Sequence, residues 1–99
     1  MKNLLLVLEL ARILAGETPT CPIEAKVSAA YVWEENKVWY GNSEPTALDL
    51  YVAFNYTKYP NPTPGAKFFV SPTDVKNMPF LNDILEEWVC IDTTVRAYN

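Results

Sequence analysis

The sequence of 99 residues contains no histidine and no glutamine. The lack of histidine excludes Ser-His-Asp and Cys-His catalytic groups, histidine-ligated zinc sites and histidine pH switches, because each of them needs an imidazole. If the chain is an enzyme, its proton transfers must come from carboxylates, tyrosine, lysine or cysteine. Basic residues are also few, with eight against twelve acidic ones and a net charge of −4. This balance argues against neutralisation of phosphates, and we expect no nucleic-acid partner.

Cysteine is scarce as well, with only Cys21 and Cys90. Two thiolates are too few for a four-cysteine zinc site, so we expect no metal, and we expect no cofactor either. The two cysteines could form one disulfide that closes a long loop and stabilises the fold by about 4 kcal/mol, or they could remain as two buried thiols. Because nothing else in the sequence indicates an oxidising compartment, the sequence slightly favours free thiols.

The apolar run at residues 4–8 superficially resembles a secretory signal. Glu9 and Arg12 interrupt it before it reaches the length that such a signal needs. We find no later segment long enough to cross a bilayer. We therefore interpret the run as a helix of the mature chain, and expect a soluble protein with no export signal of its own and no membrane span.

Apolar residues at spacings of three and four predict helices in the first half of the chain. The first helix is expected over residues 3–15, with Gly16 ending it. The second runs from Pro22 to about Glu35, with the proline in its first turn. The third starts near Ser43, which is a good N-cap residue.

The second half of the chain changes character, because prolines at positions 60, 62 and 64 forbid a helix or a central strand there. The apolar run at 67–70 predicts a short strand, and 71–74 opens a turn or a short helix. We expect a last helix over 83–88, capped by Asn82.

A final strand is expected within residues 89–97. The pattern as a whole predicts a single α+β domain over residues 1–99, mainly helical, with a short β element near residues 66–71 and a C-terminal strand.

Glu17 stands out among the twelve acidic residues, most of which have simple explanations on solvated helix faces or in first helical turns. It follows the glycine expected to end an apolar helix, and it precedes Thr18 and Pro19, which oppose continuation of that helix. A carboxylate held there among apolar groups tends toward a raised pKa, which a general acid needs in order to protonate a glycosidic oxygen. The alternative is an ordinary exposed turn residue.

Aromatic residues are dense between positions 33 and 59, and sugar rings stack their apolar faces on such side chains. Several of these aromatics are expected to form the core instead. Trp39 and Tyr40 precede Gly41 between two predicted helices, so this pair is the best candidate for exposed substrate-binding aromatics.

Two segments, in the right order, resemble the motifs of a known family. The first has Leu-Ala-Arg at 10–12 and Gly-Glu at 16–17, followed at the same spacing by Pro22, Glu24, Lys26, Val27 and Ala30. The second reads Asn-Pro-Thr-Pro-Gly-Ala-Lys-Phe-Phe at 61–69, followed by Ser-Pro at 71–72. Trp88 and the stretch 94–96 are similar to the C-terminal region of that family, the cell-wall hydrolases related to spore-cortex-lytic enzymes. The chain departs from the family pattern at 18–20, where Thr-Pro-Thr stands in place of Ala-Arg-Gly.

The resemblance implies a lysozyme-like domain that cleaves the β-1,4 bond between N-acetylmuramic acid and N-acetylglucosamine. It also implies that Glu17 is the catalytic glutamate. The substrate groove would be lined by residues of the second motif, with Gly65 allowing a close backbone approach. These groove residues are Thr63, Gly65, Ala66 and Phe69.

Two products are compatible with this chemistry. A lytic transglycosylase needs one carboxylate, because the sugar's own 6-hydroxyl closes a 1,6-anhydro ring. Hydrolysis would need a second carboxylate, such as Glu24 or Asp49.

The leading hypothesis is a peptidoglycan-cleaving glycosidase or lytic transglycosylase whose partner is a glycan strand. The small size resembles that of a bacteriophage endolysin, which is present in the cytoplasm of the producing cell and acts on the cell wall after release. Two alternatives remain open. One is a non-catalytic glycan-binding or structural protein of the same fold, and the other is a small protein-interaction module whose surface aromatics contact a partner.

Overall fold

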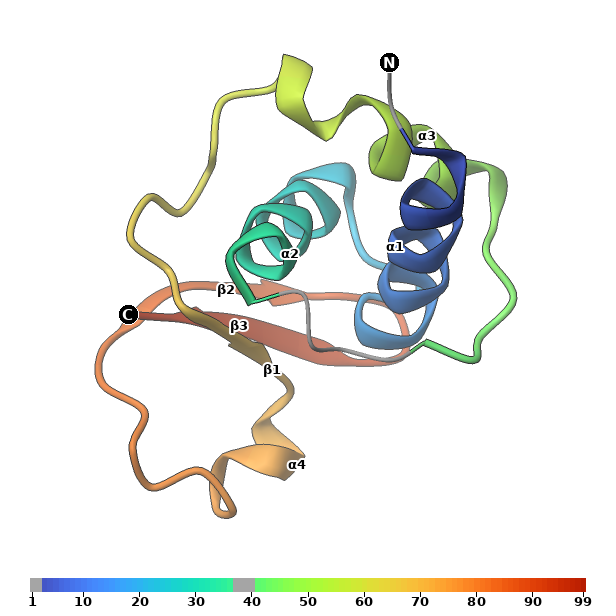
Figure 1. Cartoon of the computed structure of the whole chain (residues 1–99). Coiled ribbons are helices and arrows are strands. Elements are labelled where there is room, and N and C mark those ends of the chain that lie inside the picture. Colours follow the sequence, from blue (N-terminus) through green and yellow to red (C-terminus); the bar gives the residue numbers. More distant parts are fainter. Residues whose placement is uncertain (1–2, 37–40) are drawn as a thin grey trace.

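The computed structural model of the chain describes residues 3–36 and 41–99. The elements in chain order are α1 (Leu4–Glu17), α2 (Ile23–Asn36), α3 (Ala47–Asn55), the 3₁₀ turn η1 (Tyr56–Lys58), β1 (Phe68–Val70), α4 (Pro72–Val75), β2 (Ile84–Val89) and β3 (Thr94–Tyr98). The strands form one antiparallel sheet in the order β1-β3-β2. In Figure 1, α1, α2 and α3 lie together on one side, whereas α4 and the connection to β2 project away from them. The predicted α+β domain is confirmed.

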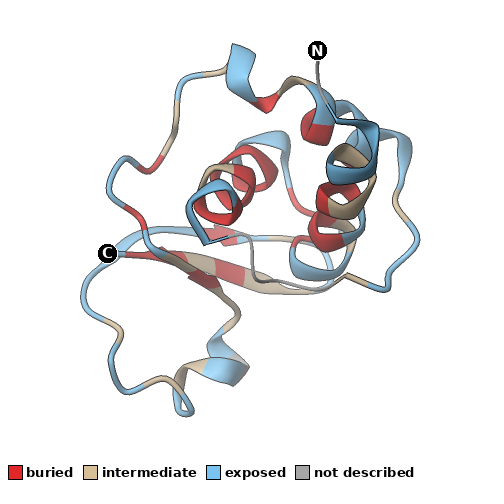
Figure 2. Cartoon of the chain, viewed as in Figure 1, coloured by how far each residue is buried: buried red, intermediate tan, exposed pale blue. Residues whose placement is uncertain are grey.

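The core lies between the long helices and the sheet. Figure 2 shows buried segments in α1, α2 and α3, and again along β3. Because α2 contributes several alanines to this core, neighbouring elements can approach it closely. The largest fully buried apolar side chains are Leu10, Ile13, Leu14, Val32, Val52 and Val95.

The end of α1 differs from the prediction, because the helix continues through Gly16 and ends at Glu17. Thr18 stops it instead. The backbone N–H and the hydroxyl of Thr18 both donate to the carbonyl oxygen of Leu14, at 2.9 and 2.6 Å. Gly16 thus lies within the last turn of the helix. The buried Thr18 donates to a terminal carbonyl that would be hydrogen-bonded by a C-terminal glycine motif in other helices.

The start of α3 also differs from the prediction, since the helix begins at Ala47 rather than near Ser43. Thr46 is the N-cap, and its hydroxyl accepts a hydrogen bond from the backbone N–H of Asp49 at 3.3 Å. Asp49 returns the interaction by accepting from the backbone N–H of Thr46 at 2.9 Å. The two hydrogen bonds of this capping box favour a helix start at Ala47 over a start near Ser43, where a serine alone would cap the helix.

The helix predicted over 83–88 is wrong, because this segment is β2 and pairs with β3. Within β2 only Trp88 is buried, and its register partner on β3 is Val95. Aromatic and β-branched residues fit such a half-covered surface, and the pairing with β3 outweighs the local helical pattern of the acidic residues. The final strand, β3, begins after a turn in which Cys90 N–H donates to the carbonyl of Thr93 at 2.7 Å.

Cys21 and Cys90 form a disulfide, so the sequence's slight preference for free thiols is wrong. The bond joins the loop between α1 and α2 to the chain just beyond β2, across a sequence separation of 69 residues. A hydrogen bond from the N–H of Asp92 to the hydroxyl of Thr20, at 3.0 Å, links the same two segments. Spacing alone could not reveal this contact, because the β-hairpin that carries Cys90 was not predicted.

Candidate functional site

Glu17 lies at a pocket of about 250 Å³, lined by Glu17, Phe68, Phe69, Val70, Asp74 and Met78. Three elements meet there: the end of α1, strand β1 and the short helix α4. Glu17 is exposed as a residue, yet the pocket removes part of the water around its carboxyl group. This desolvation raises the pKa of Glu17, and the negative charge of Asp74 raises it further.

Lys26 stabilises the backbone next to Glu17. The Lys26 ammonium, on α2, donates to the carbonyl oxygen of Thr18 at 2.7 Å and to the Thr18 hydroxyl at 3.3 Å. A cation placed at the C-terminal end of a helix also interacts favourably with the carbonyl dipoles there. The residue directly after Glu17 is therefore fixed by a side chain from another helix.

Lys26 itself is part of a buried ion pair with Asp49 on α3, with the two atoms Nζ and Oδ1 2.5 Å apart. Their side chains are only 4% and 1% exposed. The other carboxylate oxygen of Asp49 accepts from the backbone N–H and the hydroxyl of Thr46, each at 2.9 Å. This cluster joins α1, α2 and α3 at one point, directly behind the end of α1.

The apolar wall of the pocket comes from β1 and is itself fixed by aromatic contacts. Phe68 packs against Phe80, with ring centroids 5.0 Å apart. Phe69 is stacked on Trp88 of β2, with centroids 6.0 Å apart. These contacts hold a hydrophobic surface beside the Glu17 carboxyl group, which is the environment that disfavours its ionised form.

Of the groove residues that the resemblance implies, the structure brings Phe69 to the same pocket as Glu17. Thr63 and Ala66 are buried, and the Thr63 hydroxyl shares a 2.6 Å hydrogen bond with that of Ser28. Neither of them is part of that pocket's lining. Gly65 has a positive φ of 87°, which favours glycine, and a side chain there would meet open space.

The predicted exposed pair, Trp39 and Tyr40, lies outside the described residues. The two carboxylates considered for a hydrolytic partner are elsewhere: Asp49 is in the buried ion pair, and Glu24 lines a separate pocket beside Tyr59. The residue that sequence reasoning missed is Asp74, which does line the Glu17 pocket. The only available signal was its place in the Ser-Pro-Thr-Asp turn, which carries no chemical signature.

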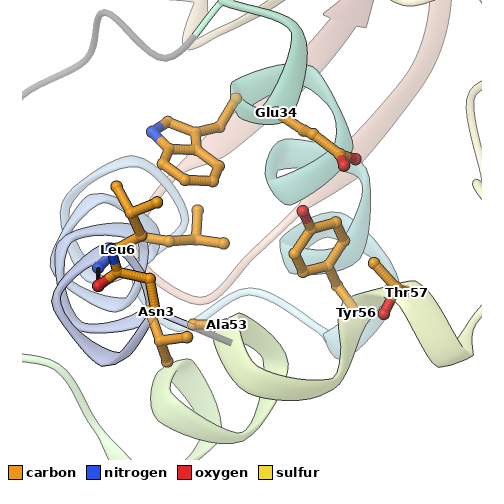
Figure 3. Close-up of a pocket in the computed structure, with 9 residues that line it drawn as sticks. Asn3, Leu6, Glu34, Ala53, Tyr56 and Thr57 are labelled. Carbon is orange, nitrogen blue, oxygen red and sulfur yellow. Dashed lines mark hydrogen bonds between the residues drawn. The ribbon is translucent and has the colours of Figure 1, made fainter. Parts of the chain in front are cut away.

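A second pocket, of about 170 Å³, lies between α1, the end of α2 and the end of α3. Figure 3 shows Glu34 and Tyr56 on one side of it, and Leu6 of α1 with the N-cap residue Asn3 on the other. Burial, followed by the charge and hydrogen bonding of Glu34, raises the pKa of Tyr56 to about 12. A phenol with that pKa stays protonated near neutral pH, so Tyr56 does not act as a proton acceptor there.

Comparison of the chain with family models, with curated proteins and with solved structures finds no significant match. Among residues 3–36 and 41–99, no helix is long and apolar enough to span a membrane. Within the same ranges there is no group of three or more potential metal-ligating side chains. The chemistry of the Glu17 pocket and the sequence motifs around Glu17 are therefore the features that point to a function.

Proposed function

We propose that this protein is a peptidoglycan-cleaving glycosidase or lytic transglycosylase, in which Glu17 protonates the leaving oxygen of the MurNAc–GlcNAc β-1,4 bond. The observation that carries the proposal is the position of Glu17 at the end of α1, beside an apolar pocket that raises its pKa. A carboxyl group that keeps its proton above the usual range is what a general acid requires. The substrate class comes from the resemblance of the two motifs.

The disulfide supports a site of action outside the cytoplasm, because such bonds persist in oxidising surroundings. We place the protein on the cell wall after its release from the producing cell. The single domain then has to keep its fold outside the cell, where a cross-link between the helical part and the sheet is stabilising.

Glu17→Gln is expected to reduce the release of muropeptides from purified peptidoglycan by at least about a hundredfold, because the amide cannot donate the proton. The measurement is digestion by both proteins, with the released fragments identified by mass spectrometry. The matched control is Glu35→Gln, which makes the same change at an exposed position on α2. It is expected to leave the rate unchanged.

Two results would contradict the proposal. One is folded wild-type protein that releases nothing from several types of cell wall. If it still sediments with those walls, a glycan-binding protein without catalysis is the better description. The other is Glu17→Gln with the activity of wild type.

The raised pKa of Glu17 also predicts how stability depends on pH. The folded state binds this proton more tightly than the unfolded state, so the contribution of Glu17 is present at low pH and is lost as pH rises through its folded pKa. Glu17→Gln has no such loss. The difference in melting temperature between Glu17→Gln and wild type (variant minus wild type) should therefore increase from about pH 3 to about pH 7. Thermal denaturation at both pH values checks this, and a relative fall would contradict the raised pKa.

A further inference from the structure

We propose that Asp74 is a second catalytic carboxylate of this site, which activates a water molecule and makes the reaction hydrolytic. The inference rests on the proposed function of Glu17 and adds the residue that decides the product. It replaces the two carboxylates that the sequence offered for this role, neither of which lines the Glu17 pocket.

The two carboxyl groups come from different elements of the same pocket. Glu17 is at the end of α1, Asp74 is on α4, and β1 contributes the apolar wall. Among the described lining residues these are the only titratable side chains, since the others are Phe68, Phe69, Val70 and Met78. Glycoside hydrolysis commonly uses two carboxyl groups, and this pocket is lined by a glutamate and an aspartate that can supply both.

The carboxylate of Asp74 is oriented by the start of α4. The hydroxyl of Ser71 donates to Asp74 Oδ2 at 3.1 Å, and the backbone N–H of Asp74 donates to the Ser71 carbonyl at 3.0 Å. Among the described residues, Ser71 is the only hydrogen-bond donor to this carboxylate. In the proposed reaction Oδ1 accepts the proton, since the Ser71 hydroxyl is bonded to Oδ2.

The different surroundings of the two groups assign their roles. Desolvation favours the protonated form of Glu17, and the nearby negative charge of Asp74 has the same effect. Asp74 is exposed, so a water molecule can reach its carboxylate. Glu17, which is partly shielded from water in the pocket, is then the acid, and Asp74, which water can reach, is the base.

The proposed reaction is a single displacement. As the bond between C1 and the glycosidic oxygen breaks, Glu17 gives its proton to that leaving oxygen. A water oxygen forms the new bond to C1 from the opposite face, and its proton moves to Asp74. The product carries a new reducing end, and exchange with solvent restores both protonation states. A water molecule takes up about 30 Å³, so a pocket of about 250 Å³ has room for it beside part of a sugar ring.

The test is digestion of purified peptidoglycan in H₂¹⁸O by the wild-type protein, Asp74→Asn and the control Asp83→Asn, which alters an exposed carboxylate outside the pocket. Wild type should release reducing-end fragments that carry one ¹⁸O and first appear with inverted configuration at C1 by NMR. Asp74→Asn should lose about a hundredfold or more of this rate, and Asp83→Asn should lose none.

A second measurement separates a catalytic role from a structural one. Because the charge of Asp74 raises the pKa of Glu17, Asp74→Asn should lower that pKa, as followed by carboxyl carbon NMR. The residual activity should then fall off at lower pH than in wild type. In the pocket lining, β1 and Met78 bring no charged group toward Glu17, so the part of the pKa rise that comes from charge is due to Asp74.

The outcomes distinguish the two proposals. If wild type cleaves peptidoglycan and depends on Glu17, but gives 1,6-anhydro products without ¹⁸O, products of retained configuration, or an unchanged rate in Asp74→Asn, the role of Asp74 is overturned and that of Glu17 stands. If folded wild type releases nothing, both proposals fall.

Discussion

Lys26→Met is expected to lower the free energy of unfolding by about 3–5 kcal/mol, because it leaves the Asp49 carboxylate buried without its charged partner. Methionine fills a similar volume, so the loss comes from the uncompensated charge rather than from a cavity. The carbonyl of Thr18 also loses the ammonium that donates to it. Urea denaturation at neutral pH measures the change as a lower midpoint with an unchanged slope.

Two further variants test this explanation. Lys26→Met combined with Asp49→Asn removes both charges and keeps an oxygen that can accept from the backbone N–H of Thr46. It should recover most of the lost stability, because neutral groups cost far less to bury. Arg96→Met breaks the ion pair between Arg96 and Glu87 on the exposed side of the sheet and should cost no more than about 1 kcal/mol. A loss in Lys26→Met as small as in Arg96→Met would contradict the argument.

Local patterns predicted the first two helices and β1 to within two residues. The apolar spacing of α1 and the prolines before β1 are short-range signals, and they need no partner elsewhere in the chain. Segment 83–88 was predicted incorrectly because its conformation depends on a register with β3. Strand formation here is decided by pairing and by burial of Trp88, neither of which is local.

In the candidate site too, features that depend on local sequence were predicted and features that depend on distant contacts were not. Glu17 was found from its own neighbourhood, because an apolar helix and a proline lie on either side of it. The ion pair that stabilises the backbone next to Glu17 was not predicted, because Lys26 and Asp49 are 23 residues apart and no spacing rule joins them. The motif resemblance placed Thr63 in the groove, whereas the Thr63 hydroxyl is hydrogen-bonded inside the protein to that of Ser28, 35 residues away. Asp74 was missed because it is far from Glu17 in the sequence, and the two share a pocket only once β1 and α4 are placed beside the end of α1.

Reduction of the disulfide between Cys21 and Cys90 is expected to destabilise the protein by about 4 kcal/mol, because a cross-link over so long a loop restricts the unfolded chain. For a domain of this size, that loss lowers the melting temperature by roughly 15–30 °C. Thermal denaturation with and without a reductant measures it, after mass spectrometry has confirmed that both thiols are reduced. A change of less than about 2 °C in fully reduced protein would contradict the prediction.

The matched control is the double variant Cys21→Ser and Cys90→Ser, which should have the lower melting temperature of reduced wild type and no response to reductant. The local effect is expected near Glu17, because the cross-link fixes the loop that follows α1. After reduction, the hydrogen bond from Asp92 N–H to the hydroxyl of Thr20 is the remaining side-chain link between the two segments among the described residues. Faster hydrogen exchange at Asp92 would show that this link alone does not hold the loop against the sheet. Unchanged exchange would mean that packing, rather than the cross-link, positions the end of α1.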